Sequence, residues 1–240
     1  MAGSATLVAV EGPSAAGKTT LVRTAARRFG WVVLPEAFDR LDPAPSLEFD
    51  SPEHLLLLEE TLLAEEARRY GEARQRCAVG RTVLADTGFL GPVTYTRGLV
   101  ALGRSPPSVA RSLERSARAL LRNGGLGIPD LTVYLATSDR ERARRAERDR
   151  PRHPEGLFAR HETVGALERR LFESRFPRAL PSRFRTLSAD PSPAALSVAL
   201  RRLVADAPST PAVQWEGLQL LRALGPVAAP RCGRNAGPNR

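Results

Sequence analysis

The stretch Gly12-Pro13-Ser14-Ala15-Ala16-Gly17-Lys18-Thr19 decides the fold of this chain. It has the form G-x-x-x-x-G-K-[ST], a loop whose backbone N–H groups surround the phosphates of a bound nucleotide. Residues 6–10, just before it, form a short apolar run rich in β-branched side chains, which favours a buried strand. After the loop, apolar residues recur at helical spacing as far as Phe29, and Gly30 ends the pattern. This is the context that the motif requires, so a chance match in a loop of small residues is disfavoured.

A single lysine stands among 35 arginines, and it is Lys18. Its compact ammonium group on a thin stem suits a position between the β- and γ-phosphates better than the planar guanidinium of arginine. We expect the hydroxyl of Thr19 to bind Mg²⁺, so the predicted cofactors are ATP and Mg²⁺. The residues expected to contact the nucleotide are Gly12, Pro13, Ser14, Ala15, Ala16, Gly17, Lys18, Thr19 and Thr20.

Composition narrows the setting in which the chain works. Its 240 residues suit one domain of ordinary size, and two cysteines without zinc spacing fit a reducing cytoplasm, the expected location. No charged-then-apolar leader is evident and no apolar stretch approaches the ~18 residues that span a bilayer, so we expect no membrane association. The net charge of +10 comes from arginines spread along the chain with acids among them, so nucleic acid is the least favoured partner.

Four further apolar runs are predicted strands, and helical patterns separate them. The strands are expected at residues 31–34, 81–85, 131–135 and 184–187, and the helices at 53–79, 108–122, 138–150, 155–176 and 193–204. Alternation of this kind predicts an α/β fold, with a five-stranded parallel sheet between two layers of helices as in P-loop NTPases. We expect this domain to occupy residues 1–206. The Pro/Gly-rich stretch 207–240 is expected to be a partly disordered tail with one short helix at 215–224.

Two carboxylates follow predicted strands. Asp86 ends the strand 81–85, where P-loop proteins place an aspartate that holds Mg²⁺; the alternative is an aspartate that only caps the next turn. Glu36 follows the strand 31–34, on the edge where open α/β sheets bind ligands. It could accept the proton of an attacking hydroxyl, or equally be a surface glutamate after a proline.

The densest charge lies between Asp139 and His153, with seven arginines and four acids. A run of this kind is typical of a solvated helix with i,i+4 ion pairs. Alternatively, it forms an arginine-rich lid at about residues 138–155 that closes over ATP, because arginine forks stabilise the charge on a γ-phosphate in transfer. The histidines His54, His153 and His161 have no metal-ligand spacing and are expected to be surface or structural residues.

Together these pieces resemble the P-loop nucleoside and nucleotide kinases, in particular thymidylate kinases and deoxynucleoside kinases. The resemblance spans about residues 5–205 and rests on LVAVEGPSAAGKTT, VVLPEAF, VLADTGFLG, and PDLTVYL followed by RRAERDR. It implies that Lys18 is catalytic and that Glu36 is the general base near an acceptor hydroxyl. The phosphate-contacting lid pattern R-x-x-x-R-x-R would be Arg144, Arg148 and Arg150.

The resemblance also suggests contacts outside the nucleotide loop. Arg68, on the predicted helix 53–79, is a candidate substrate contact. A homodimer through that helix and the helix 108–122 is an open alternative to burial of their apolar stripes in the core.

The chain departs from the family on the acceptor side. The family usually has Asp-Arg or Glu-Arg after the third strand, whereas this chain has Asp86-Thr87-Gly88 and lacks the arginine. The glutamine that grips a pyrimidine base in many deoxynucleoside kinases is not evident either, because Glu59, Glu60 and Thr61 occupy that region. The acceptor is therefore open between a nucleoside, a nucleotide and another small hydroxylated metabolite.

The leading hypothesis is an ATP-dependent small-molecule kinase that transfers the γ-phosphoryl group to a hydroxyl or phosphate of a nucleoside, nucleotide or related metabolite. A nucleotide-binding regulatory ATPase without an acceptor is the alternative from another class, and an antibiotic or metabolite phosphotransferase is a further one. A nucleic-acid-binding ATPase has only the charge in its favour.

Overall fold

A five-stranded parallel sheet forms the centre of the molecule. The computed structural model describes residues 5–43, 49–148 and 157–227, and only the backbone of residues 148 and 157–163. The strands are β1 (Leu7–Glu11), β2 (Val32–Leu34), β3 (Val83–Asp86), β4 (Leu131–Ala136) and β5 (Phe184–Ser188). They lie in the order β2-β3-β1-β4-β5, and each neighbouring pair is parallel. This confirms the predicted fold class, and each strand lies within two residues of its predicted bounds.

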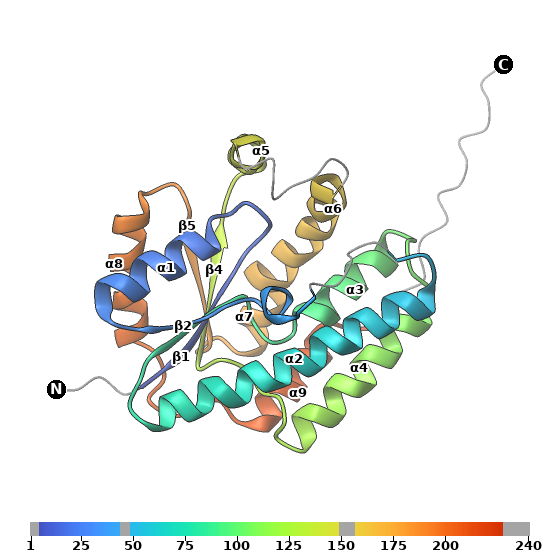
Figure 1. The fold of residues 1–240 in the computed structure, drawn as a ribbon, viewed down its shortest axis with the longest axis horizontal. Helices are drawn as coiled ribbons and strands as arrows, with labels where there is room; N and C mark the ends of the chain where they lie inside the picture. The colour runs from blue at the N-terminus through green and yellow to red at the C-terminus, as the bar shows by residue number, and fades with distance from the viewer. Residues whose placement is uncertain (1–4, 44–48, 149–156, 228–240) are drawn as a thin grey trace.

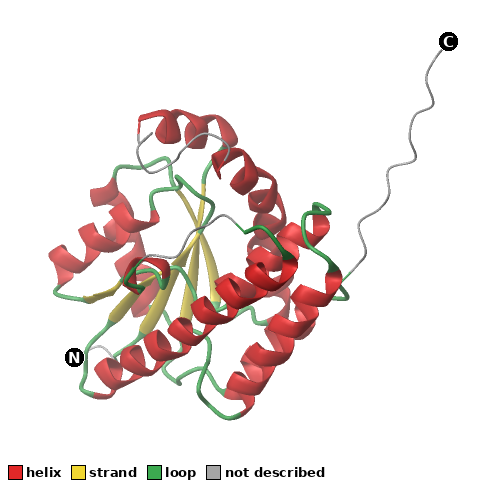
Figure 2. Ribbon diagram, turned by 45° about the vertical axis from the view of Figure 1, so that its right-hand side comes forward, coloured by secondary structure: helices red, strands yellow, loops and turns green. Residues whose placement is uncertain are grey.

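Helices cover both faces of this sheet (Figures 1 and 2). One face carries α1 (Lys18–Phe29) and α8 (Pro193–Ala205). The other carries α2 (Pro52–Ala78), α3 (Gly91–Ala101), α4 (Pro107–Arg122), α6 (Leu157–Arg170), α7 (Phe176–Ala179) and α9 (Gln214–Ala223). The helix α5 (Asp139–Arg148) stands apart at the carboxyl end of the sheet, at the top of Figure 1. A short 3₁₀ turn, Phe38–Arg40, follows β2.

The position of β1 at the centre of the sheet explains why its sequence is apolar without interruption. Successive side chains of a strand point to opposite faces. Leu7 and Ala9 therefore enter the core under α2 and its neighbours, while Val8 and Val10 enter the core under α1 and α8. All four are 0% exposed. Because every strand runs the same way, the loops after β1, β2, β3 and β4 meet at one edge, where parallel sheets bind ligands.

Helix α3 is absent from the elements that the sequence predicts. It begins at Gly91-Pro92 and contains Gly98, residues that weaken a helical pattern although proline is well tolerated in a first turn. The glycine has a packing role here. A Cβ on Gly98 would lie 2.8 Å from a methyl carbon of Val164, so glycine lets α3 approach α6 closely.

The predicted helix 155–176 is longer and less regular than expected. It continues from α6 through a π-helical turn, Leu171–Arg175, into α7. Pro177 lies in this last part and has no N–H to donate to the preceding turn, which favours a local change of hydrogen-bond pattern. Leu171, Phe172 and Phe176 are all buried there.

The stretch after residue 206 packs on the domain as far as the structure describes it. Leu220 and Leu221 of helix α9, and Leu224 just after it, enter the core under α4. The boundary at residue 206 stays a prediction, and the end of the predicted tail, residues 228–240, lies outside the described residues. Among the described helices, none has the length and apolar character to cross a membrane.

Candidate active site

The loop between β1 and α1 has the backbone shape of a phosphate cradle. Gly12 and Gly17 have φ angles of 148° and 99°, where glycine is strongly favoured, and Ala15 has φ of 61°. A Cβ on Gly12 would lie 2.8 Å from the carbonyl oxygen of Leu135, so the close approach to β4 also requires glycine. The loop leads directly into α1, whose N-terminal N–H groups and dipole attract anions. The predicted order of strand, loop and helix is confirmed.

The ammonium group of Lys18 lies inside the curl of this loop. Its Nζ donates to the carbonyl oxygens of Gly12 at 2.9 Å and Pro13 at 3.4 Å. A phosphate entering the loop would therefore meet the lysine already in place. The contacts predicted for the residues from Gly12 to Thr20 remain predictions, and the backbone geometry is consistent with them.

Asp86 closes β3, the strand beside β1, in register with Val10. Its side chain is buried, and Oδ1 has no hydrogen-bond partner among the described residues. A buried carboxylate without a partner is unfavourable unless a cation neutralises it, so this atom fits a metal ion. No group of three or more His, Cys, Asp or Glu in the described ranges could hold a metal, but Mg²⁺ commonly takes one or two protein ligands with phosphates and water. Asp86 and Thr19 fit that pattern.

Glu36 comes from a third segment and meets the same site. Burial raises the pKa of its carboxyl group, the charge of Lys18 lowers it, and the charge of Asp86 raises it. Because β2, β3 and β1 are neighbouring parallel strands, the three groups that end or follow them share one edge of the sheet. A carboxylate whose pKa is raised is also the stronger base.

Helix α2 brings Arg69 to this edge of the sheet, and the substrate contact predicted for Arg68 stays a prediction. Arg68 is 69% exposed, whereas Arg69 is fully buried and donates to the backbone oxygen of Asp86 at 2.9 Å. Arg69 also pairs with Glu66 and lies 3.5 Å from the backbone oxygen of Leu34. It therefore ties the ends of β2 and β3 together. One residue turns a helix by about 100°, so adjacent arginines of α2 differ in exposure.

Glu11, the last residue of β1, also lies at this edge. Its Oε1 accepts a hydrogen bond from the N–H of Gly88 at 2.8 Å. Burial raises the pKa of Glu11 to about 8, the nearby charge of Glu168 adds to the rise, and Lys18 opposes it. Glu11 has no role among the sequence predictions, although its position next to the glycine loop is a signal that could have found it.

Glu168, on α6, approaches the site from the opposite side. Burial raises its pKa, while Lys18 and Arg142 lower it. Helix α6 comes close to the loop one turn earlier, where a Cβ on Gly165 would lie 3.7 Å from the Cβ of Pro13. No sequence pattern distinguishes Glu168, because only the packing of α6 against the loop brings it here.

Two arginines of α5 hold the outer side of the phosphate loop. Arg142 Nε donates to the backbone oxygen of Ser14 at 3.1 Å. Arg145 donates through Nη1 to Ala16 at 2.6 Å and through Nη2 to Ala189 at 3.0 Å. These contacts are made with carbonyl oxygens, so they fix the loop and leave its N–H groups for phosphate.

Of the three arginines predicted to form the lid, Arg144 lies at the surface of α5, and the other two lie wholly or partly outside the described residues. Arg144 is half exposed and pairs with Glu141, with Nε 2.7 Å from Oε2. Hydrogen bonds from Arg144 and Arg145 lower the pKa of Glu141 to about 2. The side chain of Arg148 and the whole of Arg150 are not among the described parts of the chain, so the lid stays a prediction.

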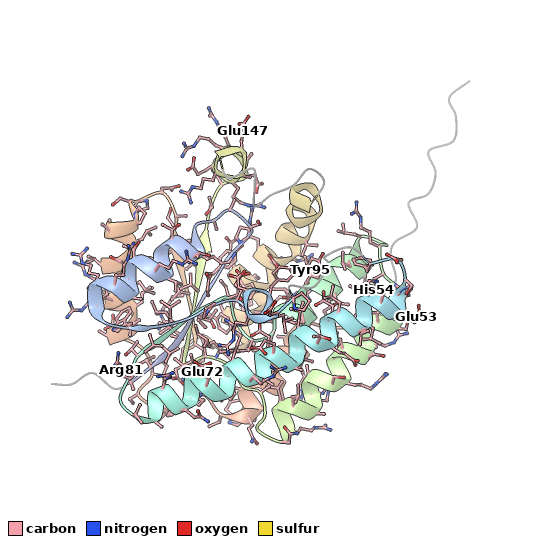
Figure 3. All side chains as sticks on the ribbon, in the orientation of Figure 1. Glu53, His54, Glu72, Arg81, Tyr95 and Glu147 are labelled. Carbon is pink, nitrogen blue, oxygen red and sulfur yellow. The ribbon has the colours of Figure 1, made fainter. Side chains whose placement is uncertain are left out.

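Of the three histidines considered in the sequence, only His54 has a described side chain, and it lies away from the site. His54 lies at the exposed start of α2 (Figure 3). His153 and the side chain of His161 lie outside the described part of the chain.

A cavity of about 500 Å³ lies between α5 and the end of β5. It is lined by Ser138, Arg140, Glu141, Arg144, Arg145 and Asp190. Because Arg145 also contacts Ala16, the cavity adjoins the phosphate loop.

Comparison with known proteins agrees with this geometry. Residues 7–155 match the family described as AAA domain. The chain belongs to the AAA-domain family. A comparison with curated protein sequences finds no match for this AAA-domain protein.

Solved structures show that the fold is shared with deoxynucleoside kinases. Deoxyadenosine kinase from M. mycoides with bound dATP superimposes with a TM-score of 0.64 at 14% identity, over 82% of this chain and 98% of that chain. The same enzyme with products dCMP and a flexible dCDP gives a TM-score of 0.60 at 15% identity, over 81% and 96%. With bound dCTP it gives 0.54 at 16% identity, over the same shares. At the level of fold, the resemblance seen in the sequence is confirmed.

Proposed function

We propose that this AAA-domain protein is an ATP-dependent small-molecule kinase. The observation that carries the proposal is the convergence of Lys18, Asp86 and Glu36 at one edge of the sheet. A phosphate cradle, a carboxylate suited to a metal ion and a carboxylate suited to a hydroxyl proton are the groups that phosphoryl transfer to an alcohol needs. The shared fold of deoxynucleoside kinases supports this choice among P-loop activities.

The donor nucleotide would bind with its phosphates in the glycine loop. Lys18 would lie between the β- and γ-phosphates, and the ribose and base would extend toward the open pocket beside Arg145. Thr19 and Asp86 would hold Mg²⁺, which neutralises phosphate charge. Deoxyadenosine kinase, which has this fold, was solved with dATP bound and with dCTP bound, and this supports a nucleoside triphosphate as ligand of the site.

In the transfer step, the acceptor hydroxyl oxygen attacks the γ-phosphorus. The bond from that phosphorus to the β,γ-bridging oxygen breaks, and ADP leaves with the electron pair. Glu36 takes the hydroxyl proton. Most of the rate enhancement would come from in-line positioning and from the positive potential of the loop and Lys18.

Acceptor-dependent ADP release tests this proposal. Nucleosides, nucleotides and hydroxylated metabolites would be screened with ATP and Mg²⁺, with each product identified by mass. Lys18→Met should reduce turnover at least a thousandfold, while Arg23→Met, an exposed cation on the same helix, should leave it unchanged. Full turnover in the Lys18 variant would exclude the assignment.

A regulatory ATPase without an acceptor is the second candidate. Thr87, in place of the arginine that the kinases usually have, favours it, because an acceptor contact is then missing. The same screen separates the two: a regulator shows one basal rate of ADP release that no acceptor raises.

A further inference from the structure

The turn after β3 contains a strained residue. Thr87 has a φ angle of 68°, in the left-handed region that a β-branched side chain rarely adopts. Such strain persists only where the surrounding structure imposes it, and it gathers at functional sites. Thr87 follows Asp86 directly, and the buried Oδ1 of Asp86 has no hydrogen-bond partner among the described residues. The strained residue is therefore next to the carboxylate that fits a metal ion.

Strand β1 holds this turn from one side. The N–H of Thr87 donates to the backbone oxygen of Val10 at 3.2 Å, and the N–H of Gly88 donates to Oε1 of Glu11 at 2.8 Å. Both contacts use N–H groups of the turn. They fix its distance from β1, but they do not engage the backbone oxygen of Asp86.

Arg69 of α2 holds the turn from the other side. Its Nη2 donates to the backbone oxygen of Asp86 at 2.9 Å, and its guanidinium lies over the ring of Phe89, 5.4 Å from the ring centroid. One side chain therefore contacts the residue before Thr87-Gly88 and the residue after it. Glu66 pairs with Nη1 of the same guanidinium and keeps it in this orientation.

Arg69 is too deeply buried to contact a ligand itself. Its side chain is 0% exposed, and Phe89, which it contacts, is 1% exposed. Its Nε has no hydrogen-bond partner in the described part of the chain, so an apolar side chain of similar size would fill this space at lower cost. An apolar side chain could not hold the turn, however, so the use of arginine here is explained by its contacts with Asp86 and Phe89.

We propose that Arg69 is a positioning residue that holds the turn from Asp86 to Phe89 in its strained form and thereby fixes the Asp86 carboxylate where Mg²⁺ binds. This inference rests on the proposed kinase function, because it concerns the metal ion of that site. Without Arg69, Thr87 would relax toward an ordinary φ angle, and the backbone of Asp86 would move with it. The affinity for the metal would then fall although no metal ligand had changed.

Nucleotide binding with and without metal tests this role. Calorimetry on the full chain would compare the affinity for a non-hydrolysable ATP analogue in Mg²⁺ and in EDTA, and the ratio of the two gives the Mg²⁺ enhancement. Arg69→Lys keeps a cation beside Glu66 but lacks the planar fork of arginine. It should reduce the Mg²⁺ enhancement about tenfold and change the affinity in EDTA less than about threefold. Arg76→Lys, at an exposed position of the same helix, should change neither.

Asp86→Asn shows whether Arg69 acts through Asp86. This substitution should itself reduce the Mg²⁺ enhancement, because it removes the charge that faces the metal. Adding Arg69→Lys to Asp86→Asn should then reduce the enhancement no further, since residues that act through one another are not additive. A full second loss in the double variant would contradict the proposed role.

Thr87→Gly separates a held turn from a general loss of structure. Glycine adopts the left-handed conformation without strain, so Thr87→Gly should restore about threefold of the lost Mg²⁺ enhancement in the Arg69→Lys background. It should also be more favourable for the melting temperature of the unmodified protein than for that of Arg69→Lys, by about 2–4 °C, because only the unmodified protein keeps Thr87 strained. Comparing the two backgrounds cancels the effect of glycine on the unfolded chain.

A second background serves if Arg69→Lys does not fold. Arg69→Met together with Glu66→Met removes both charges of the buried pair, which proteins tolerate better than the loss of one. The inference is overturned if the Arg69 variant keeps the full Mg²⁺ enhancement, or if Thr87→Gly has the same effect in both backgrounds. The kinase proposal fails separately, when nucleotide binding depends on Mg²⁺ but no acceptor raises ADP release.

Discussion

Lys18 influences more of the site than the phosphates it is predicted to bind. Its charge lowers the pKa of three glutamates that come from β1, the segment after β2, and α6. Those groups would be harder to ionise without it, because burial and mutual repulsion both raise their pKa values. One ammonium group therefore links the phosphate loop to these three glutamates through electrostatics, and replacing it should disturb both.

The buried Glu59 predicts a pH dependence of stability. Its pKa is raised from 4.5 to about 8 in the folded protein, so between these values the folded state keeps a proton that the unfolded state has lost. Stability must then fall as pH rises from 5 to 8. Glu59→Gln removes this contribution and should narrow the difference in unfolding free energy between pH 5 and pH 8 by a few kcal/mol, since a tenfold change in proton affinity corresponds to about 1.4 kcal/mol.

Urea unfolding at the two pH values would measure this effect. Glu60→Gln is the matched control, because the neighbouring carboxyl group is exposed and should contribute little. An unchanged pH dependence in the Glu59 variant would show that burial does not raise the pKa of this carboxyl group in solution.

Gly88 offers a test of Glu11 in the site. A Cβ on Gly88 would overlap Oε1 of Glu11, the atom that accepts the hydrogen bond from the Gly88 N–H. Because the clash involves the end of a flexible side chain, Gly88→Ala should displace the carboxylate with a loss of stability of about 1 kcal/mol or less. We expect turnover to fall at least tenfold while the melting temperature changes little.

Gly91→Ala is the control for that substitution, because a Cβ at Gly91 meets nothing within 4 Å. It should leave both turnover and melting temperature close to those of the unmodified protein. Equal turnover in the two variants would argue against a role for the Glu11 carboxylate.

Whether a residue of the candidate site can be predicted from the sequence depends on what sets its position. The glycine loop, Lys18 and Glu36 are predicted from local sequence because their spacing is set by a turn or a strand end. Arg69 cannot be separated from Arg68 without the phase of α2 against the sheet. Glu168 depends on long-range packing, which no local pattern encodes.

At the scale of elements, α5 acts on the phosphate loop through Arg145. This side chain joins Ala16 of the loop to Ala189 after β5, whereas Arg144 pairs with Glu141 at the surface. Arg145→Ala should lower the affinity for ATP about tenfold or more, since it frees the loop and removes positive charge beside it. Arg144→Ala should change the affinity less than threefold, because an exposed ion pair contributes little.

Calorimetry with a non-hydrolysable ATP analogue would compare these two arginine variants under identical salt conditions. A larger effect at Arg144 would support the predicted lid pattern instead, with α5 moving when nucleotide binds.

The elements themselves are predictable where one physical rule dominates. β1 and β4 are buried on both faces and appear as unbroken apolar runs, so their sequences are unambiguous. α3 escapes sequence prediction because Gly98 serves close packing against α6 rather than helix propensity. The π-helical turn before α7 escapes it too, because this turn replaces a regular helix by a local rearrangement that periodicity does not reveal.

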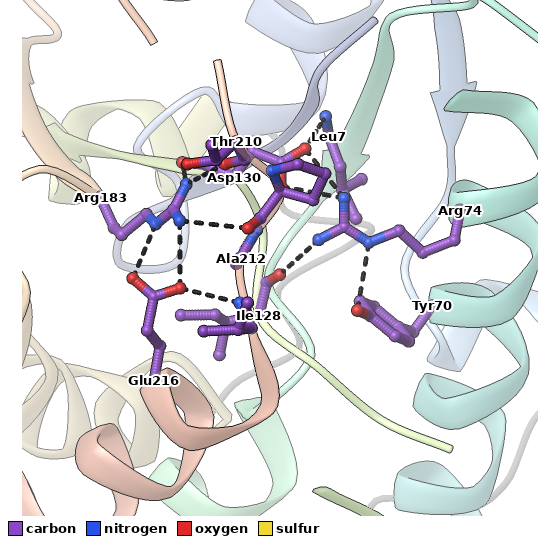
Figure 4. A network of polar contacts seen from close by, with 11 residues as sticks. Leu7, Tyr70, Arg74, Ile128, Asp130, Arg183, Thr210, Ala212 and Glu216 are labelled. Carbon is purple, nitrogen blue, oxygen red and sulfur yellow. Dashed lines mark hydrogen bonds and ion pairs between the residues drawn. The ribbon is translucent and has the colours of Figure 1, made fainter. Parts of the chain in front are cut away.

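At the scale of the whole molecule, a polar network joins the C-terminal stretch to the amino end of the sheet (Figure 4). Asp130, just before β4, accepts hydrogen bonds from the backbone of Leu7 and Ala212 at 2.9 Å each and pairs with Arg74 of α2. Arg183, before β5, pairs with Glu216 of α9. This end of the molecule is opposite the nucleotide loop, so its role is structural, and the stretch containing α9 completes the core.

Glu216→Ala should reveal how much stability this junction provides. Arg183 is 5% exposed, and Glu216 accepts hydrogen bonds from its Nε and Nη2, both at 3.0 Å. Removing the carboxylate leaves a buried guanidinium without its charge partner, which costs about 3–5 kcal/mol in similar buried pairs. We expect urea unfolding to show a loss of that size, with ATP affinity preserved in the folded fraction because the nucleotide loop lies at the other edge of the sheet.

Trp215→Ala, at a neighbouring side chain that is 61% exposed, is the control and should lower the free energy of unfolding by less than about 1 kcal/mol. If the two variants were equally stable, α9 would be held by its leucines alone, and the polar network would only fix its orientation.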